Sequence, residues 1–387
     1  MSQTIHTWEK QELRFTLQGR YANPYTDVKV WVELEGPGFR RRCYGFWDGG
    51  DEYIVRVTAT APGAWSWRAG SDTDDPGLMG QEGSFEAIDW STAERAANRC
   101  RRGFLRPTQN GHAFMHADGT PCFLLGDTWW AAGTFRFPMA DTDTPETPRS
   151  LPHYVAQRAH QGFNCIFIIA ALPNWVDDGL PATLDTDEGM VVRRAWPQTD
   201  TRHAKPMHDE DGNLPFQFPG RVPGFEQSVP DLDRINPAYF RSLDRKIDYL
   251  NAHGFIPFIE PARRDIGQVW AKHHDWPSSY ARYVQYIWSR YQANNCLLSP
   301  IHYDLGAFSV PAPMWSQAAN AVVDTYGMPP FGTPVGANSD GSSLLNFGHT
   351  DAAPWLDFHQ TGNARRDHYS YAQLTDAFNS NPPVPVL

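Results

Sequence analysis

The hydrophobic pattern of the sequence changes near residue 91, and this change limits the chain to a two-part architecture. Before it, apolar and polar residues alternate with period two in Leu13–Leu17, Val28–Leu34 and Tyr53–Thr58. Short strands separated by Gly and Pro turns, without helical periodicity, are typical of an antiparallel sandwich. We therefore predict an immunoglobulin-like β-sandwich at residues 1–95.

After Ser91, buried strand-like runs alternate with helical segments, the pattern of parallel β/α units. Each run ends in polar residues, as in a TIM barrel, whose site lies at the C-terminal ends of its strands. We predict an α/β fold with a (β/α)8 TIM barrel at residues 96–387, incomplete at its C-terminus. The long stretch Leu172–Asp233 is expected to be a loop over the barrel mouth. The expected strands are 121–127, 163–170, 254–260, 296–304, 333–338, 356–360 and 383–387, and the expected helices are 154–160, 239–250, 280–291, 315–326 and 371–378.

Composition limits the class of partner. A net charge of −11 disfavours nucleic acid and anionic membranes. No stretch of about 18 apolar residues and no secretory signal occurs, and the five scattered Cys indicate no disulfide framework, so we predict a cytoplasmic protein. No spacing of metal ligands or cofactor motif is present, so no metal and no cofactor are expected. The 15 Trp favour a carbohydrate partner, since flat apolar rings stack on sugars, although cores also use aromatic residues.

Three carboxylates stand at the expected strand ends, namely Asp127, Glu260 and Asp304. Glycoside hydrolysis needs two carboxyl groups, one as acid and one as nucleophile or base. Asp127 can instead cap the following helix, and Glu260 can instead pair with a nearby arginine. Asp304 lies two residues after His302, so the two side chains share one face of a strand. We assign Asp304 and Glu260 as the catalytic pair.

The remaining polar and aromatic residues at the strand ends suit a ligand rich in hydroxyl groups. Amides and carboxylates form hydrogen bonds with hydroxyls, and Trp offers a stacking surface. His359 and Gln360 are adjacent in sequence, so only one of these two is expected to point inward. The predicted substrate-binding residues are Asp127, Trp129, Trp130, Asn174, Trp175, Arg264, His302, Asn338, His359 and Gln360.

The chain resembles the apiosidase-like glycoside hydrolases over nearly its whole length, and five segments carry most of the resemblance. They are Phe123-Leu-Leu-Gly-Asp-Thr-Trp-Trp130, Gly162-Phe-Asn164, Arg234–Phe240, Ser299–Asp304 and Asp357–Gly362. The resemblance implies an immunoglobulin-like domain before a (β/α)8 barrel, an acid/base after strand four and a nucleophilic glutamate after strand seven. The fourth expected strand, 296–304, ends in His302-Tyr303-Asp304. The resemblance implies an Asn-Glu pair at this strand end, so the sequence departs from the pattern here. The chain stops at Leu387, before the expected glutamate, so the resemblance implies a truncated barrel.

We therefore expect a glycoside hydrolase that acts on oligo- or polysaccharides with retention of configuration. The alternative is a non-catalytic carbohydrate-binding protein, and a third reading is a lyase with His302 as its base. Because the expected nucleophile is missing, we expect this chain to bind sugar weakly without turnover. An open barrel edge is also expected to favour self-association.

Overall fold

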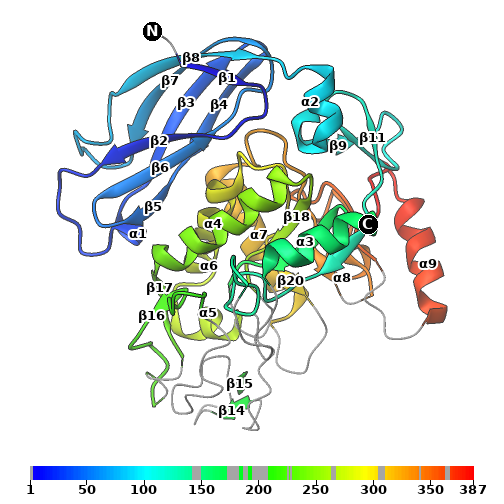
Figure 1. Cartoon of the computed structure of the whole chain (residues 1–387). Coiled ribbons are helices and arrows are strands. Elements are labelled where there is room, and N and C mark those ends of the chain that lie inside the picture. Colours follow the sequence, from blue (N-terminus) through cyan, green and yellow to red (C-terminus); the bar gives the residue numbers. More distant parts are fainter. Residues whose placement is uncertain are drawn as a thin grey trace.

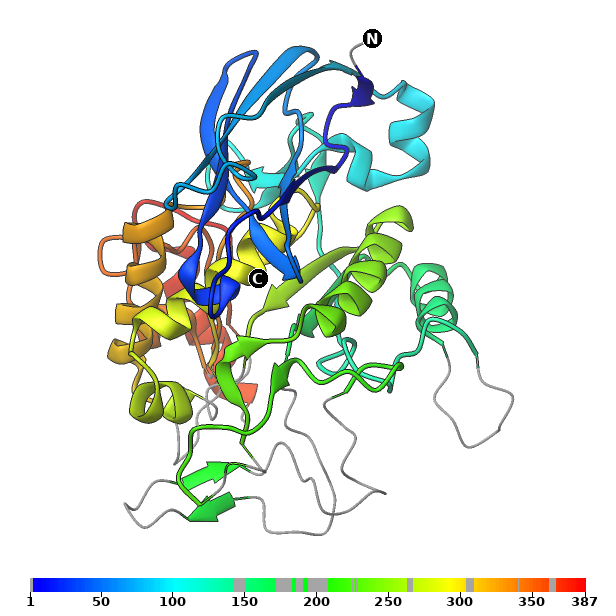
Figure 2. The same ribbon diagram turned by 90° about the vertical axis from the view of Figure 1, so that its left-hand side faces the viewer.

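The computed structural model describes residues 3–141, 150–171, 208–224, 226, 229–262, 267–303, 310–339, 341–361 and 367–387, together with the strands β14 (Thr183–Asp185) and β15 (Val191–Arg193). Two bodies are visible in it (Figure 1): a β-sandwich formed by the first strands, and a mixed α/β body beside it. Figure 2 shows the same arrangement from the side, with β14 and β15 at the end far from the sandwich.

Two sheets form the N-terminal body. Their facing sides enclose an apolar core that includes Val32, Leu34, Val55 and Trp65. Gly36 is required at its position, because a Cβ there would lie 2.3 Å from the Trp65 ring. The strands predicted around residues 13–17, 28–34 and 53–58 are confirmed. One sheet has the order β1 (Gln3–His6), β8 (Glu82–Ile88), β7 (Gly63–Ser71), β3 (Val30–Gly36) and β4 (Phe39–Tyr44), and the other β2 (Gln11–Thr16), β6 (Glu52–Val57) and β5 (Phe46–Gly49), with α1 (Pro24–Asp27) between β2 and β3.

A series of parallel strands organises the second body. The four-stranded sheet has the order β12 (Gly126–Thr128), β13 (Cys165–Ile169), β18 (Ile256–Glu260) and β19 (Leu297–Leu298), with every pair parallel. Parallel pairing continues from β20 (His302–Tyr303) to β21 (Asn338–Ser339), and from His359 to Val386. The predicted parallel order is therefore confirmed across these segments.

Helices connect and cover these strands, as the alternating pattern predicts. Their buried faces carry the large apolar residues that form one core with the strands. Helices α5 and α8 were not expected from the sequence. The helices are α3 (Leu151–His160), α4 (Pro237–Ala252), α5 (Gly267–His273), α6 (Ser278–Tyr291), α7 (Ala312–Tyr326), α8 (Ser343–Phe347) and α9 (Asp367–Phe378), and the pair β16 (Phe216–Gln217) and β17 (Asp231–Ile235) precedes α4.

The predicted strand 121–127 is corrected by the structure. Its first residues form β11 (Pro121–Cys122), which pairs antiparallel with β10 (Phe114–His116), itself paired with β9 (Leu105–Pro107). The parallel strand begins only at Gly126, where a Cβ would lie 2.7 Å from the Phe167 ring. Phe114 packs edge-on against Phe358, so the small sheet lies against the interior side of the parallel strands. It follows α2 (Thr92–Ala97) and the short helix η1 (Arg99–Arg102).

A buried charge network joins the two bodies. Arg56 of β6 and Arg290 of α6 both bind the Asp244 carboxylate of α4, with Nη2–Oδ2 distances of 2.6 and 2.7 Å. Arg290 also reaches Asp48 of β5 at 2.8 Å. Burial acts to raise the pKa of Asp244, but the two guanidinium groups outweigh it and hold this pKa far below its ordinary value. The network therefore fixes the sandwich to α4 and α6.

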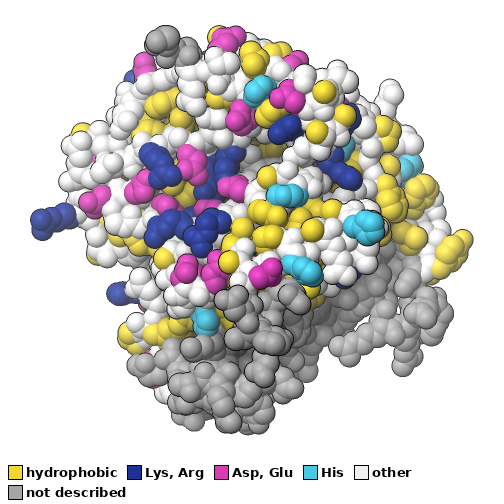
Figure 3. Space-filling model, in the orientation of Figure 1, with side chains coloured by type: hydrophobic (Ala, Val, Ile, Leu, Met, Phe, Trp, Pro, Cys, Tyr) yellow, Lys and Arg dark blue, Asp and Glu magenta, His cyan; other side chains and the backbone are white. Residues whose placement is uncertain are grey.

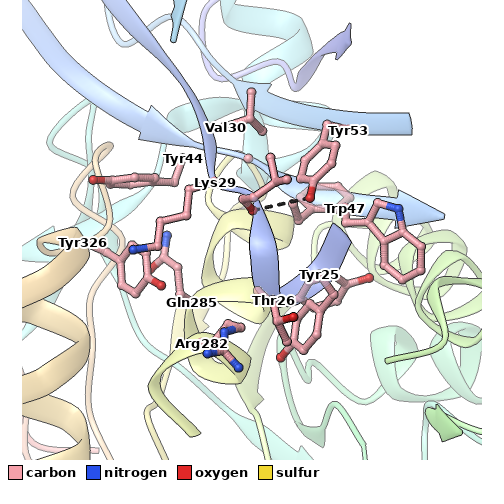
Figure 4. Close-up of a pocket in the computed structure, with 14 residues that line it drawn as sticks. Tyr25, Thr26, Lys29, Val30, Tyr44, Trp47, Tyr53, Arg282, Gln285 and Tyr326 are labelled. Atoms are coloured by element: carbon pink, nitrogen blue, oxygen red, sulfur yellow. Dashed lines mark hydrogen bonds between the residues drawn. The ribbon is translucent and has the colours of Figure 1, made fainter. Parts of the chain in front are cut away.

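A small cavity lies at the same interface, between the sandwich and α6 (Figure 4). Aromatic side chains and two cations line it, among them Tyr25, Lys29, Tyr326 and Arg282. Its volume of about 50 Å³ leaves room for roughly three water molecules. A sugar ring does not fit in this space, so we do not assign a substrate site here.

The surface in the view of Figure 3 shows acidic and basic side chains interspersed over the sandwich. Apolar side chains gather at the right, over α9, where Tyr371, Leu374 and Phe378 are exposed. No helix among the described residues has both the length and the apolar character needed to cross a membrane.

Candidate active site

A carboxylate and an imidazole meet where β18 ends and β20 begins. Glu260 is the last residue of β18 and shares its face with Phe258, which packs against Phe167 and Phe358 inside the strand series. His302 begins β20 and lies 2.7 Å from Glu260, measured from Nδ1 to Oε2. Both side chains are buried. The alternation of β18 therefore directs Glu260 inward, toward His302.

Two further residues complete this cluster, which we call the Glu260 cluster: Trp130, Glu260, His302 and Asn338. Asn338 pairs with His302 in register, and its Nδ2 lies 3.3 Å from His302 Nδ1. Trp130 follows β12 and meets the His302 ring edge to face, with centroids 4.7 Å apart. Trp130 comes from the chain after β12, which β13 separates from β18, so the cluster depends on the arrangement of several strands.

The charge state of Glu260 determines which of the two groups donates the hydrogen bond between them. An ionised carboxylate can only accept a hydrogen bond, so Nδ1 of His302 must then carry the proton. In a buried site such a contact is stronger than in water and keeps both groups in one geometry. Glu260 is therefore held in a defined orientation at the strand ends.

Helix α6 supports the backbone that carries these groups. The Tyr283 hydroxyl donates to the carbonyl of Pro261 at 2.8 Å, and the Tyr280 hydroxyl donates to that of Pro300 at 2.5 Å. Trp288 Nε1 donates to Ser299 at 3.2 Å. These carbonyls follow the strands, where the sheet no longer supplies donors, and a buried carbonyl needs a partner. The sequence analysis assigned this segment as a helix without a role for its aromatic residues, and so missed their donor role.

We predict that Tyr283→Phe destabilises the fold by about 1–2 kcal/mol, because it leaves the buried Pro261 carbonyl without its donor. Urea unfolding followed by tryptophan fluorescence measures the change. Tyr239→Phe is the matched control, since Tyr239 is equally buried and its hydroxyl has no hydrogen-bond partner among the described residues. Equal losses in the two variants would contradict the supporting role of Tyr283.

The neighbours His359 and Gln360 point to opposite sides, as expected for adjacent positions. Gln360 lies two residues after the interior residue Phe358, so the two side chains are on the same face of the extended chain. Its Oε1 accepts a hydrogen bond from Ser339 N at 2.8 Å. His359 faces the other side, where its Nδ1 lies 2.9 Å from Ser343 Oγ. Gln360 is therefore the one that borders the strand ends on the side of the Glu260 cluster.

The structure does not bring Asp127 or Trp129 to the Glu260 cluster. Asp127 Oδ2 accepts from Arg158 of α3 at 2.5 Å and from Trp129 Nε1 at 3.0 Å. Trp129 stacks on Phe137, in the helical layer. Partial burial acts to raise the pKa of Asp127, but the hydrogen bonds from Arg158 and Trp129 lower it overall. Both residues hold α3 on the strands, because odd positions of β12 face outward.

Four predicted site residues lie outside the described residues: Asn174, Trp175, Arg264 and Asp304. The pairing of Glu260 with Asp304 as two catalytic carboxylates therefore stays a prediction, as does the loop over the mouth.

One cluster of described residues has the composition of a metal site: Asp231, Asp233 and His274. Arg221 engages both carboxylates, with Nε–Oδ1 and Nη1–Oδ2 distances of 3.0 Å each. The backbone N–H of Leu232 donates to His274 Nε2 at 3.1 Å, so the lone pair of this nitrogen is already engaged. This arrangement is an ion-pair cluster that holds β17 to α5 and α6, and we assign no metal to it.

A chain of hydrogen bonds runs from His359 through His349 to the carbonyl of Pro382. His349 Nε2 lies 2.8 Å from the Pro382 carbonyl, which can only accept, so this nitrogen carries a proton. With both rings neutral, His349 Nδ1 then accepts from His359 Nε2 at 3.0 Å, and His359 Nδ1 accepts from Ser343 Oγ. Sequence reasoning missed His349, since nothing in its neighbourhood indicates a buried partner.

Asp357 and His359, two residues apart, should respond to pH in opposite directions. Burial, then His349, lowers the pKa of His359 to about 4, so acidification from about pH 6.5 to 4 destabilises the fold by up to about 3 kcal/mol. Burial raises the pKa of Asp357 to about 6, against a hydrogen bond from Val335 N, so acidification from about pH 6 to 4 stabilises the fold by a similar amount. The two effects nearly cancel in the unmodified protein.

We therefore predict that the Asp357→Asn variant loses stability as the pH falls from about 6.5 to 4. The His359→Asn variant should instead gain stability as the pH falls through the same interval. Urea midpoints measured from pH 4 to 7 for both variants check this. Three parallel pH profiles would show that neither group titrates as its environment indicates.

Parallel β/α units with polar groups gathered where the strands end are typical of barrel-type α/β enzymes, whose sites lie at this end of the strands. The family model for apiosidase-like catalytic domains matches residues 108–387, and a model for a domain of unknown function, DUF5060, matches residues 4–72. The chain therefore belongs to the apiosidase-like family. A search of curated proteins finds no match.

Two solved structures of glycoside hydrolases were compared with this chain. A protein from Bacteroides vulgatus assigned as a glycoside hydrolase is 18% identical with a TM-score of 0.59, over 87% of this chain and 56% of that one. A glycoside hydrolase of family 5 from the same organism is 15% identical with a TM-score of 0.44, over 74% of this chain and 53% of that one. The chain thus spans little more than half the length of these structures. Of the two, only the first, with its TM-score of 0.59, indicates a shared fold. At 18% identity it indicates nothing beyond the fold.

Proposed function

We propose that the protein is a glycosidase that hydrolyses glycosidic bonds of oligo- or polysaccharides with retention of configuration. The observation that supports it is the buried contact between Glu260, at the C-terminal end of β18, and His302, which begins β20. The C-terminal end of the strands is where barrel enzymes carry their chemistry. Trp130 and Asn338 beside the pair offer a stacking surface and an amide for sugar hydroxyls.

In this mechanism Glu260 is one of the two carboxyl groups and Asp304 the other. One donates a proton to the leaving oxygen while the other attacks the anomeric carbon, and the glycosyl–enzyme bond is then cleaved by water that the first group activates. Retention requires the two carboxyl groups to stand about 5–5.5 Å apart. His302 keeps Glu260 oriented, and its positive form would favour the ionised carboxylate.

We further assign residues 1–95 to an immunoglobulin-like domain that braces residues 96–387. The buried contacts of Arg56 and Asp48 with α4 and α6 support this role. In the described structure Glu260 belongs to β18, far along the chain from the sandwich, so we place the chemistry in the second domain.

The test is hydrolysis of a panel of oligosaccharides that differ in sugar and linkage. Release of a reducing end, with the anomeric form of the first product followed by NMR, supports a retaining glycosidase. Products that appear first with the opposite anomeric configuration would overturn retention. The complete absence of hydrolysis across linkages would overturn the enzymatic assignment.

The second candidate is a carbohydrate-binding protein without turnover. The observation that favours it is that Glu260 is already engaged by His302 at 2.7 Å, an arrangement that also suits a purely structural pair. Saturable binding of an oligosaccharide by calorimetry, with the sugar recovered intact, would support this candidate over the first.

A further inference from the structure

A second cavity lies at the opposite end of β18 from the Glu260 cluster. It has a volume of about 310 Å³ and is lined by η1, by the chain before β18 and by β10 and β11. His253 and Gly254 border it just before β18, whereas Glu260 ends that strand. The strand between them spans roughly 13 Å. Figures 1 and 2 show α2 and its neighbours at the end of the molecule away from β14 and β15.

The lining of this cavity is basic, in a protein whose net charge is −11. Arg95, Arg99 and Arg102 contribute to it, and no Asp or Glu is among its described lining residues. Arg95 pairs with Asp89 at 3.0 Å and Arg102 with Asp118 at 3.2 Å, both outside the lining. In the described part of the chain, Arg99 has no ion-pair partner. One guanidinium is therefore available for an anion.

Two imidazoles complete the polar lining. His116 is buried, and its Nδ1 lies 3.2 Å from the carbonyl of Gly103, while His253 Nδ1 lies 2.8 Å from that of Tyr249. A carbonyl only accepts, so in both rings Nδ1 carries the proton and Nε2 is the remaining polar atom. Each Nε2 is then an acceptor for a hydroxyl group.

The wall that carries Arg99 is built by specific contacts. Asn98 donates to the carbonyls of Asn251 and Ala252 at 2.9 and 3.0 Å, which fixes the start of η1 to the end of α4. Gly254 adopts a φ of +77°, and a Cβ there would lie 3.7 Å from Arg99 Cγ. The Arg99 side chain therefore lies beside this tight turn, at the mouth of the cavity.

We propose that this cavity binds a sugar-sized molecule that carries one anionic group, a carboxylate or a phosphate. Arg99 binds the anion, since a guanidinium offers paired donors matched to both groups. The imidazole Nε2 atoms meet hydroxyls of the same ligand, and Phe123, which also lines the cavity, offers an apolar face. The volume is in the range of small-molecule sites, roughly 300–1,000 Å³.

The test is isothermal titration of the whole protein at about 20 mM salt, where charge interactions are least screened. The probes are glucuronate, glucose 6-phosphate, inorganic phosphate and neutral glucose. We expect saturable binding of at least one anionic probe, and at least tenfold weaker binding in Arg99→Gln. Arg40→Gln is the matched control, because Arg40 on β4 is 81% exposed and carries the same charge; its affinity should stay within twofold.

The probes also distinguish the source of the anion. Tighter binding of glucuronate assigns a carboxylate sugar, tighter binding of glucose 6-phosphate than of inorganic phosphate assigns a sugar phosphate, and equal affinity for the last two assigns the free phosphate group. The proposal is overturned if no anion binds saturably, if glucose binds as well as its anionic forms, or if Arg99→Gln and Arg40→Gln behave alike.

Discussion

Glu260→Gln is expected to reduce kcat/KM for glycoside hydrolysis by about a thousandfold, because proton transfer or attack by a carboxyl group is removed. In the structure His302 Nδ1 lies 2.7 Å from the Glu260 carboxylate. Glutamine has the same shape as glutamate, and its Oε1 can still accept this hydrogen bond. The fold should therefore be preserved while the chemistry is lost. Steady-state kinetics on the best substrate of the oligosaccharide panel measures the effect.

The matched control is Glu35→Gln, which makes the same change on β3 at a side chain that is 64% exposed. Its activity should equal that of the unmodified protein. His302→Gln separates positioning from chemistry: it should lower kcat and change the pH profile, without abolishing turnover as Glu260→Gln does. Activity of Glu260→Gln within threefold of the unmodified protein would transfer the role to another carboxylate.

The parallel β/α order could be predicted because buried parallel strands appear as continuous apolar runs. The run before Glu260 and the run around Cys165 each became a strand of the central sheet. The position of Glu260 at a strand end then followed from the pattern, and its contact with His302 depended on two neighbouring strands lying side by side. Neighbours in a parallel series are the most predictable contacts of this fold.

The inward or outward direction of a side chain was less predictable, because a shift of one residue reverses every position of a strand. Asp127 follows an apolar run in the sequence, yet it faces α3 and binds Arg158. The run itself is divided between β11 and β12, with Phe123 exposed between them. Hydrophobicity alone does not show that division, because it depends on antiparallel pairing with β10.

Contacts between distant elements left no signal in the sequence. The hydroxyls of Tyr280 and Tyr283 support the strand ends only because α6 packs across them. The chain through His359 and His349 requires α8 and the segment before Pro383 to meet. Residues of this kind read as core aromatics or isolated histidines until the packing is known.

Asp244→Ala is expected to lower the free energy of unfolding by about 3–5 kcal/mol. Asp244 is the carboxylate that both Arg56 and Arg290 bind, and all three side chains are buried. Among the described carboxylates, its removal leaves Arg290 with Asp48 alone and Arg56 with Glu12 alone. The two guanidinium groups then lose the carboxylate they share, in a site with little water where weakly compensated charge is costly. Urea unfolding followed by circular dichroism measures the loss, and the sandwich should separate from α4 and α6 at lower denaturant.

The control for this substitution lies on the same helix. Asp248→Ala also removes a salt bridge, to Lys10, but its side chain is 46% exposed, so we expect a loss of about 0–1 kcal/mol. Adding Arg56→Met to Asp244→Ala should recover part of the stability, because one of the two neighbouring guanidinium groups that repel each other without Asp244 is removed, and the effects of residues in contact are not additive. Equal losses for Asp244→Ala and Asp248→Ala, or a fully additive double variant, would show that the buried network does not hold the two domains together.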